Sequence, residues 1–550
     1  MNITWLDINA SYSHSSLALP ALESQLETEV RKRCTINVVC GTIKSPIEDI
    51  IDQTIKSAPQ YILATGWLFN IGYLLSVLSR INAIDNKIKI VLGGPEFLGN
   101  NEEFLKRNRF ITALFKGDGE EHFNEFIDII SKEPTSLEWL ELPGFEYLNN
   151  DRFVAKESVV TEEFETLTPP EESEYFRWDK AFIQIETSRG CFNSCRFCVS
   201  GINKSKVMDI PIESIRKRVD TICQKGIREI RVLDRTFNAN ASRAVDLLSL
   251  FKEFAGKLKF HLEVHPALLA PSVKEALRDI PADLLHIEAG IQSLDENVLL
   301  ECARKGTAEQ AMKGLDFLIG LGKFEVHTDF IAGLPGYSFE MLMCDIQRMI
   351  STGPGEIQLE LLKLLPGTIF REKSEEYGIK YSPYPPYEVL QTDSITFNQL
   401  KRVKVLSKIL EYWYNDKRWM NCFRKAVSAD ENFLSLLLEE LEKSPFYETL
   451  HSFESKSTIL YDFCCSHYPQ LCDEISLNWI RCGLSLKKEP ANKLRMWHFN
   501  DKQTINPIFD SNERLNSYYY FDYEGLRYWF AFNKSKERNM PTKEYTEKRN

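Results

Sequence analysis

Two long stretches of this chain alternate short apolar runs with amphipathic segments, a rhythm that restricts the fold to the α/β class. Within residues 1–135 the strand candidates are Ile3–Ile8, Thr35–Cys40, Tyr61–Thr65, Lys87–Leu92 and Ile111–Phe115. Segments of helical period separate these runs. Strands joined through helices form βαβ units, so we predict a doubly wound parallel sheet for this region.

The second alternating stretch covers residues 179–385. Its strand candidates are Phe182–Glu186, Glu229–Leu233, Lys259–Val264, Leu285–Ala289, Glu325–Ile331 and Glu356–Leu361. Six β/α units are too few for an eight-stranded barrel, so a partial (β/α)6 barrel is predicted. Residues 136–178 are acidic and contain prolines, and we interpret them as a linker. Residues 386–550 lose the rhythm, are rich in aromatic side chains and are predicted to form a mainly helical domain.

The composition excludes several classes of protein. The 550 residues carry a formal charge of −12, which argues against nucleic acid as the main partner, because phosphate binding needs a basic surface. No apolar run reaches the roughly 20 residues of a membrane-spanning helix. The first residues lack the basic flank and apolar segment of a signal peptide. We therefore expect a cytoplasmic protein.

Thirteen cysteines are the unusual feature of the composition, and three of them lie within eight residues. Cys191, Cys195 and Cys198 form a CxxxCxxC motif directly after a predicted strand. Three thiolates on one loop can bind three irons of a [4Fe–4S] cluster and leave the fourth iron open to a ligand. Zinc is the alternative, but it needs a fourth ligand and the loop contains no histidine. The other cysteines, including the group Cys464, Cys465, Cys472 and Cys482, are interpreted as buried thiols.

The motif and the sequence that follows it, over about residues 182–379, resemble the radical S-adenosylmethionine (SAM) superfamily. The resemblance implies that Cys191, Cys195 and Cys198 hold a [4Fe–4S] cluster and that Phe197 packs near the adenine of SAM. Further SAM contacts are implied for residues on or after later strands: Asp234, Thr236, Glu288, Gln292, Ser293 and Arg304. Asp234 and Thr236 stand where many members carry Gly-Gly-Glu, so this chain departs from the usual motif there.

The N-terminal region resembles the cobalamin-binding domain of the B12-dependent radical SAM class. Its strand ends carry the candidate cofactor contacts Ser13, His14, Thr65, Gly66, Gly93, Gly94, Gly117, Gly119 and Glu120. The Asp-x-His-x-x-Gly motif of a histidine-ligated cobalt is absent, and His14 is interpreted as a hydrogen-bonding loop residue. The whole chain resembles B12-binding radical SAM proteins with a DUF4080-type C-terminal region. Only Cys34 and Cys40 lie in the N-terminal domain, which argues against the methylthiotransferase branch.

Three polar residues of the predicted barrel are candidate catalytic groups. Glu263 and His265 follow one another at the end of the third strand, and Asp329 lies on the fifth. Residues at the carboxyl ends of barrel strands tend to face the site, where they could position substrate or move a proton. Hydrogen-bonded wall residues are the alternative interpretation.

The resemblance implies an enzyme that cleaves SAM reductively at its cluster, with cobalamin as a second cofactor and methyl transfer to an unactivated carbon as the reaction. The alternatives are a radical rearrangement, cyclisation or oxidation without methyl transfer, or an iron–sulfur sensor protein. The implied partners are a reductant such as flavodoxin or ferredoxin and a small-molecule, lipid or peptide substrate.

Overall fold

A computed structural model describes residues 1–12, 16–161, 163–201, 207–443, 449, 451–496, 516–533 and 540–548. It divides into two compact units. Unit 1 contains Met1–Leu342 and Glu360–Leu400, and unit 2 contains Met343–Leu359 and Lys401–Asn550. Within the described ranges, every helix falls short of the length and apolarity that crossing a bilayer requires. The predicted cofactor contacts Ser13 and His14 lie outside the described residues.

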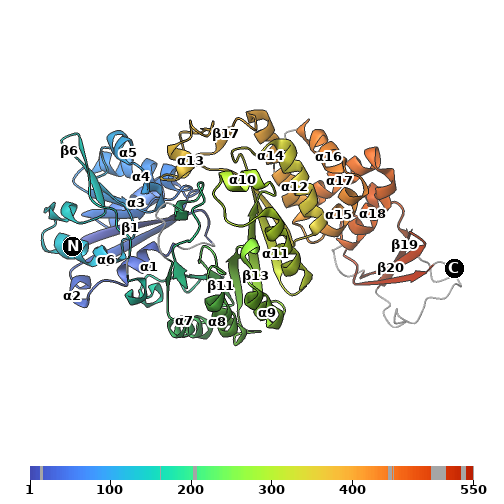
Figure 1. Ribbon diagram of the computed structural model, residues 1–550, viewed down its shortest axis with the longest axis horizontal. Coiled ribbons are helices and arrows are strands. Elements are labelled where there is room, and N and C mark those ends of the chain that lie inside the picture. Colours follow the sequence, from blue (N-terminus) through green and yellow to red (C-terminus); the bar gives the residue numbers. More distant parts are fainter. Residues whose placement is uncertain are drawn as a thin grey trace. The chain divides into compact units, whose positions relative to one another are not determined.

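Unit 1 begins with a seven-stranded sheet in the order β2-β1-β3-β4-β5-β6-β7, drawn in blue and cyan in Figure 1. The strands are β1 Asn2–Asn9, β2 Thr35–Thr42, β3 Tyr61–Thr65, β4 Lys89–Gly93, β5 Ala113–Phe115, β6 Phe145–Asn149 and β7 Arg152–Ala155. β1 to β5 pair in parallel, which confirms the predicted doubly wound sheet. β6 and β7 extend it antiparallel, inside the segment predicted as a linker.

Helices cover both faces of this sheet because its strands are apolar on both sides. Along β1, Ile3 and Trp5 belong to one buried core, and Leu6 and Ile8 belong to the other. The first core includes residues of α1 Ala18–Glu23, α2 Thr28–Arg31 and α6 Glu120–Lys132. The second includes residues of α3 Ile47–Lys56, α4 Ile71–Ile84 and α5 Glu102–Arg107. Sheets buried on both faces are typical of parallel α/β folds.

The second sheet of the chain has six strands in the order β15-β14-β13-β12-β11-β8. They are β8 Ile183–Ile185, β11 Glu229–Val232, β12 Lys259–Val264, β13 Leu285–Gln292, β14 Glu325–Ala332 and β15 Glu356–Leu361. The helices between them are α7 Ile212–Gln224, α8 Ala241–Lys252, α9 Pro271–Asp279, α10 Glu296–Glu301, α11 Ala308–Gly320 and α12 Phe339–Thr352. Neighbours in the sheet are neighbours in the chain, as the predicted partial (β/α)6 barrel requires.

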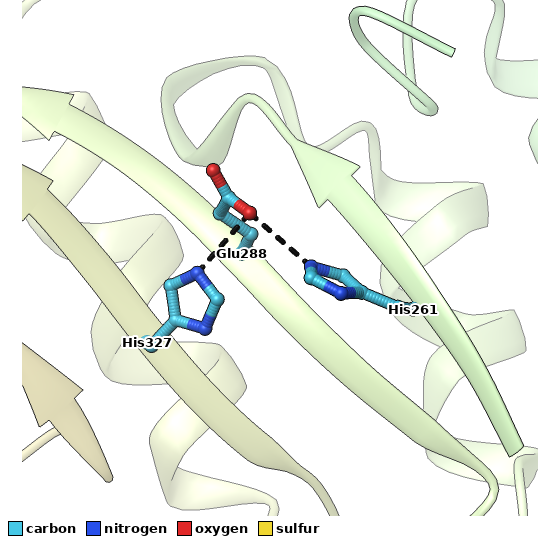
Figure 2. Close-up of side chains that lie close together, drawn as sticks. All are labelled: His261, Glu288 and His327. Atoms are coloured by element: carbon cyan, nitrogen blue, oxygen red, sulfur yellow. Dashed lines mark hydrogen bonds and ion pairs between the residues drawn. The ribbon is translucent and has the colours of Figure 1, made fainter. Parts of the chain in front are cut away.

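One face of this sheet is apolar and the other is polar. In β13, Leu285, Ile287, Ala289 and Ile291 are buried, and the residues between them are half-buried. The apolar face packs against the helices, and the polar face lines the interior, which we call the lumen. Figure 2 shows three lumen side chains, His261, Glu288 and His327, which come from adjacent strands and point toward one another.

Unit 2 contains helices and a small sheet. The helices are α14 Phe397–Ile409, α15 Met420–Ala429, α16 Phe433–Glu442, α17 Phe453–His467 and α18 Cys472–Arg481. An antiparallel sheet follows, made of β18 Arg495–Met496, β19 Asn516–Tyr523, β20 Leu526–Asn533 and β21 Lys543–Lys548. The sequence analysis predicted no strands in this region. Aromatic residues favour strands, and cross-strand pairs such as Tyr520 with Trp529 stabilise the β19–β20 hairpin.

Asn70 ties together the carboxyl ends of β1 and β3, where the order of the first sheet reverses. Its side-chain amide donates to the carbonyl oxygens of Ile8 at 2.9 Å and Thr65 at 3.0 Å. Its Oδ1 accepts from the backbone nitrogen of Trp67 at 2.7 Å. Asn70 is 2% exposed, so water does not replace these bonds when the side chain is removed.

Asn70→Ala is expected to destabilise the protein by about 2–3 kcal/mol, because it leaves buried backbone groups without partners. The melting temperature, followed by circular dichroism, measures the effect. The matched control is Asn86→Ala, since Asn86 is exposed on the same domain. Equal melting temperatures for the two variants would show that Asn70 does not hold the two strand ends.

Candidate active site

The three cysteines of the motif lie on a loop after β8 and the short strand β9 Ser188–Arg189. Cys191 and Cys195 are buried, and Cys198 is half-buried. Among the described residues, the one set of three His, Cys, Asp or Glu donors within 4.8 Å of one another is in the lumen, so at least one pair of the three cysteine sulfurs is more than 4.8 Å apart. A single zinc ion would hold sulfurs about 3.8 Å apart. The wider spacing fits a cluster in which each sulfur binds a different iron.

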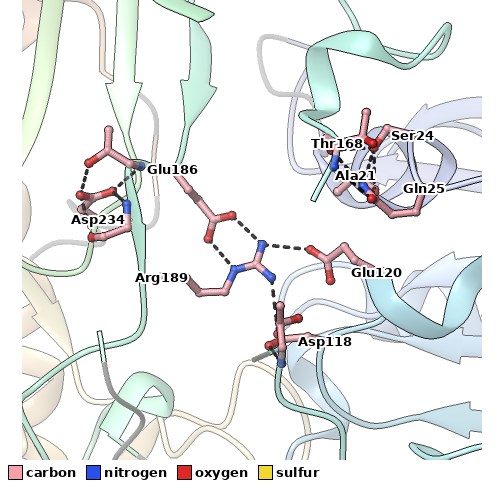
Figure 3. Close-up of polar contacts among 12 residues, drawn as sticks. Ala21, Ser24, Gln25, Asp118, Glu120, Thr168, Glu186, Arg189 and Asp234 are labelled. Carbon is pink, nitrogen blue, oxygen red and sulfur yellow. Dashed lines mark hydrogen bonds and ion pairs between the residues drawn. The ribbon is translucent and has the colours of Figure 1, made fainter. Parts of the chain in front are cut away.

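Asp234 positions the chain that enters this loop. Its carboxylate accepts hydrogen bonds from the backbone nitrogens of Thr187 at 2.7 Å and Ser188 at 2.9 Å, and from both hydroxyl groups (Figure 3). Burial raises the pKa of Asp234, and these bonds oppose that shift. Asp234 is a predicted SAM contact, but in this structure its carboxylate is hydrogen-bonded to Thr187 and Ser188.

Residues after β13 hold the loop from the other side. The backbone nitrogen of Arg196 donates to the carbonyl oxygen of Cys302 at 3.0 Å, and its guanidinium contacts Glu301 at 2.8 Å. Lys305 Nζ donates to the carbonyl oxygen of Phe192 at 3.2 Å and lies 4.6 Å from the centre of that ring. The cysteine loop is therefore fixed between β8 and the α10 region.

Arg304 lies next to the loop and favours the form of cysteine that binds metal. Its guanidinium donates to the carbonyl oxygen of Gly290 at 2.6 Å. Burial raises the pKa of the Cys195 thiol, and the nearby Arg304 opposes this shift. A positive charge stabilises the thiolate, which is the metal ligand. A side chain at Gly290 would lie 2.7 Å from Gln292 Nε2, so glycine leaves room for these groups.

Several buried polar atoms around the loop and the carboxyl ends of the strands have no hydrogen-bond partner among the described residues. They are Nδ1 and Nε2 of His265, Oε1 of Gln292, Oδ1 of Asn193 and Oδ1 of Asp329. Gln292 also has φ +70° at a bulge in β13. Buried unpaired groups and strained backbone both cost free energy and cluster where ligands bind. These atoms fit a polar ligand such as SAM.

Other predicted SAM contacts have partners within the chain. Ser293 Oγ accepts from the backbone nitrogen of Asp295 at 3.0 Å, and Thr236 Oγ1 donates to the carbonyl oxygen of Arg235 at 2.6 Å. Phe197 is half-buried on the cysteine loop. Glu288 lies deeper in the lumen, between His261 and His327 (Figure 2).

The lumen contains acidic groups that titrate near neutral pH. Burial, reinforced by the charge of Glu288, raises the pKa of Glu263 and of Asp329 to about 7. Burial would also raise the pKa of Glu288, but hydrogen bonds from His261 and His327 bring it below the usual range. Burial, with the charge of Arg304, lowers the pKa of His265 to about 3. Glu263 and Asp329 are thus suited to gain or lose a proton.

Comparison with protein families identifies this part of the chain. Residues 185–347 match the Radical SAM superfamily, and residues 375–527 match a protein family of unknown function, DUF4080. Residues 185–347 form a radical SAM domain. The prediction of a radical SAM enzyme is confirmed. The cofactors of that superfamily are SAM and a [4Fe–4S] cluster, and its enzymes need a reductant.

Solved structures of radical SAM enzymes share the fold. OxsB with aqua-cobalamin and SAM bound aligns with a TM-score of 0.61 and 15% identity, over 88% of this chain and 81% of that one. TsrM from Kitasatospora setae, with cobalamin and a [4Fe–4S] cluster bound, aligns with a TM-score of 0.55 and 16% identity, over 70% of this chain and 78% of that one.

Two relatives illustrate the sequence similarity. An uncharacterized methyltransferase from Pyrococcus horikoshii is 23% identical over 354 residues, which cover 62% of this chain and 75% of that protein. A tRNA-2-methylthio-N(6)-dimethylallyladenosine synthase from Chromohalobacter salexigens is 27% identical over 176 residues. That match covers 30% of this chain and 39% of the synthase.

The carboxyl edge of the first sheet contains the other predicted cofactor contacts. Gly94 has φ +107°, and a Cβ there would lie 2.6 Å from Thr65 Cγ2. A Cβ on Gly117, with φ +112°, would lie 2.0 Å from the carbonyl oxygen of Val159. A Cβ on Gly66 would lie 2.8 Å from the Phe97 ring, and one on Gly119 would lie 2.9 Å from Leu22. Packing within the chain therefore accounts for these four glycines. A Cβ on Gly93 would lie 3.7 Å from its nearest neighbours, Cβ and the carbonyl oxygen of Phe115, so packing does not require glycine there.

Exposed aromatic residues lie at the point of this edge where ligands are expected. In the strand order 2-1-3-4-5, a ligand binds at the carboxyl ends of β1 and β3, the topological switch point. Tyr12 follows β1, and Trp67 and Phe69 follow β3. They are 77%, 37% and 42% exposed, and the two rings after β3 stack at 6.2 Å. The sequence analysis did not propose these three rings as cofactor contacts, although exposed aromatic rings fit a large flat ligand.

This edge contacts the remainder of unit 1 at three strand ends. After β1, Lys180 Nζ donates to the carbonyl oxygen of Tyr12 at 2.6 Å. After β4, the carboxylate of Glu96 accepts a hydrogen bond from the Tyr387 hydroxyl. After β5, Glu120 forms an ion pair with Arg189 at 2.9 Å. Residues that precede and follow the radical SAM domain in the sequence, Lys180 and Tyr387, thus contact the carboxyl edge of the first sheet.

Arg189 connects this edge to the cysteine loop, which begins two residues later. It contacts Glu120 at 2.9 Å, Glu186 at 2.6 Å and Asp118 at 4.0 Å (Figure 3). Its guanidinium lies 4.2 Å from the centre of the Phe164 ring. Burial would lower the pKa of Arg189, but the three carboxylates raise it above its ordinary range.

Arg189→Ala is expected to destabilise the protein by about 3 kcal/mol, because it leaves the nearly buried carboxylate of Glu120 without its cation and removes the pairs with the half-buried Glu186 and Asp118. Calorimetric melting of the full chain measures the loss. The control is Arg177→Ala, since Arg177 and its partner Asp179 are largely exposed and such pairs contribute about 0–1 kcal/mol. A similar melting temperature for both variants would contradict this role of Arg189.

Proposed function

We propose that this chain is a cobalamin-dependent radical SAM enzyme that transfers a methyl group to an unactivated carbon. The observation that carries the proposal is the contact of three strand ends of the first sheet, through Tyr12, Glu96 and Glu120, with the remainder of unit 1. A ligand at that edge lies beside the cysteine loop. The OxsB and TsrM structures hold cobalamin, and the Pyrococcus horikoshii relative is named a methyltransferase.

The residues of this chain fit these cofactors. Cys191, Cys195 and Cys198 would hold the [4Fe–4S] cluster, and the unpaired atoms of His265 and Gln292 would hydrogen-bond SAM. The exposed rings of Trp67, Phe69 and Tyr12 would pack against cobalamin. When bound, these groups supply reductive cleavage of SAM, hydrogen abstraction and a transferable methyl group.

The lumen would bind the substrate beneath the SAM-binding edge. Its polar side chains favour a substrate with polar groups, and Glu263 at the end of β12 would position such a group by a hydrogen bond. We further propose a flavodoxin or ferredoxin as the electron donor. The second candidate reaction is a radical rearrangement, cyclisation or oxidation without methyl transfer.

The cluster assignment predicts that triple Cys→Ala protein at 191, 195 and 198 loses bound iron and sulfide and forms no 5′-deoxyadenosine. The assay uses anaerobically reconstituted protein, SAM and dithionite, with product measured by mass spectrometry. Cys223→Ala is the control, because Cys223 lies on α7 outside the loop. A triple variant that keeps iron and still cleaves SAM would refute the assignment.

Two products of the same assay separate the candidate reactions. Methyl transfer yields S-adenosylhomocysteine together with 5′-deoxyadenosine when substrate is present. 5′-Deoxyadenosine without S-adenosylhomocysteine would favour the second candidate. Failure to cleave SAM with an intact cluster would favour a sensor protein.

The cobalamin assignment predicts that the full chain retains cobalamin through gel filtration with a protein-bound absorption spectrum. Double replacement of Trp67 and Phe69 by alanine is expected to weaken binding at least ~10-fold, since each ring contributes packing area. Phe397→Ala is the matched control, because Phe397 is a 50% exposed ring at the start of α14. Unchanged binding in the double variant would place the cofactor elsewhere.

A further inference from the structure

The lumen contains a set of charged and imidazole side chains, of which the sequence analysis named Glu263, Glu288 and Asp329 but none of the histidines. Its three central strands present charged and imidazole groups at alternate positions. They are Lys259, His261 and Glu263 on β12, His286 and Glu288 on β13, and Glu325, His327 and Asp329 on β14. The interior of a closed β/α barrel is usually packed with branched apolar side chains. Apolar packing therefore does not explain the polar side chains of this lumen.

Three of these groups converge on one point. Nε2 of His261 and Nε2 of His327 each lie 3.2 Å from Oε2 of Glu288 (Figure 2). All three donor atoms lie within 4.8 Å of one another. In the part of the chain that the structure describes, no other three such donors do so.

The spacing is that of ligands around one metal ion. Zinc binds imidazole nitrogen and carboxylate oxygen at about 2.0–2.2 Å, so two tetrahedral ligands lie about 3.3 Å apart. The two nitrogen-to-oxygen distances of 3.2 Å match this separation. Two imidazoles and a carboxylate are also a common set of metal ligands in proteins.

A neighbouring histidine is positioned to hold the tautomer that a metal ligand needs. Nε2 of His286 lies 2.9 Å from Nδ1 of His327. If the proton is on Nδ1 of His327, that atom donates to His286 and the lone pair on Nε2 points to Glu288. Metal-bound histidines usually donate their other ring N–H to such a partner. The His286 ring also stacks on His261 at 4.6 Å, which holds both ligand rings in place.

A fourth ligand is within reach. Oδ1 of Asp329 lies 4.0 Å from Nε2 of His327 and has no hydrogen-bond partner among the described residues. Glu263 pairs with Glu288 in the strand register, so three carboxylates lie in one part of the lumen. A divalent cation would balance this negative charge.

We propose that His261, Glu288 and His327 bind one divalent transition-metal ion, with Asp329 as its fourth ligand. The site is separate from the cysteine loop and does not depend on cobalamin. Asp329 pairs with Gly290, two residues before the end of β13, so the ion lies below the edge where SAM is expected. Its open positions face the lumen and would take an oxygen or nitrogen donor of the substrate.

Manganese titration of the full chain with its oxidised, diamagnetic cluster tests this site. Mn²⁺ is the probe because it prefers carboxylate oxygen to soft thiolate ligands, so the many thiols of this chain compete poorly. Loss of the electron paramagnetic resonance signal of free Mn²⁺ measures binding. We expect saturation at one ion per chain, and at least ~10-fold weaker binding in His261→Ala and His327→Ala. His122→Ala is the control, because His122 lies on α6.

His261→Gln separates a metal site from a plain hydrogen-bond network. Glutamine still donates to Glu288 but is a poor metal ligand, so this variant should fold and lose manganese binding. Retained iron and SAM binding in this variant would show that the cluster site is intact, which keeps this test distinct from that of the proposed function. Non-saturable binding in the wild type, or wild-type affinity in His261→Gln, would overturn the proposal. Anomalous scattering from Mn²⁺-grown crystals would locate the ion directly.

Discussion

The ion pairs of Arg189 fix the first sheet against the loop that carries the three cysteines. Arg189 contacts Glu120, at the carboxyl edge of that sheet, and Glu186, at the end of the first barrel strand. A buried cation is costly unless it is paired with carboxylates. Any displacement of the first sheet relative to the cysteine loop would separate Arg189 from its partners and would therefore cost free energy. The edge predicted to bind cobalamin and the loop predicted to bind the cluster are thereby held together, as a reaction between two cofactors requires.

Local patterns in the sequence were sufficient to predict both sheets. Each predicted strand of the two sheets is present, because a strand buried on both faces is a continuous apolar run and a half-buried one alternates. The β19–β20 hairpin was missed, although its signals are local. Tyr518, Tyr520 and Trp529 are aromatic strand formers, and Glu524 and Gly525 both have positive φ, as a tight hairpin turn requires. The aromatic run Tyr518–Tyr523 shows no alternation of apolar and polar residues, so its composition alone did not indicate a strand.

The site was predicted less completely, because its geometry depends on residues distant in sequence. The cysteine motif is contiguous in sequence, so its spacing alone predicts the cluster ligands. The partner of Arg189 lies 69 residues earlier, and the convergence of His261, Glu288 and His327 depends on strand register. Glycine at strand ends was interpreted as a sign of a cofactor. The positive φ and close packing of Gly94 and Gly117 give these two residues a sufficient structural reason.

The polar groups of the lumen change in character along the strands. Toward the amino ends, Lys259 and Glu325 form an ion pair at 2.6 Å. In the middle, imidazole and carboxylate groups converge on one point, and toward the carboxyl ends His265 and Gln292 have buried atoms without partners. An unpaired buried group costs roughly 1–3 kcal/mol, which a stable fold accepts where a ligand later supplies the partner. The polar groups of the lumen are therefore paired toward the amino ends of the strands, while His265 and Gln292 toward the carboxyl ends have unpaired atoms where ligands are expected, and the histidine–glutamate group lies between these two regions.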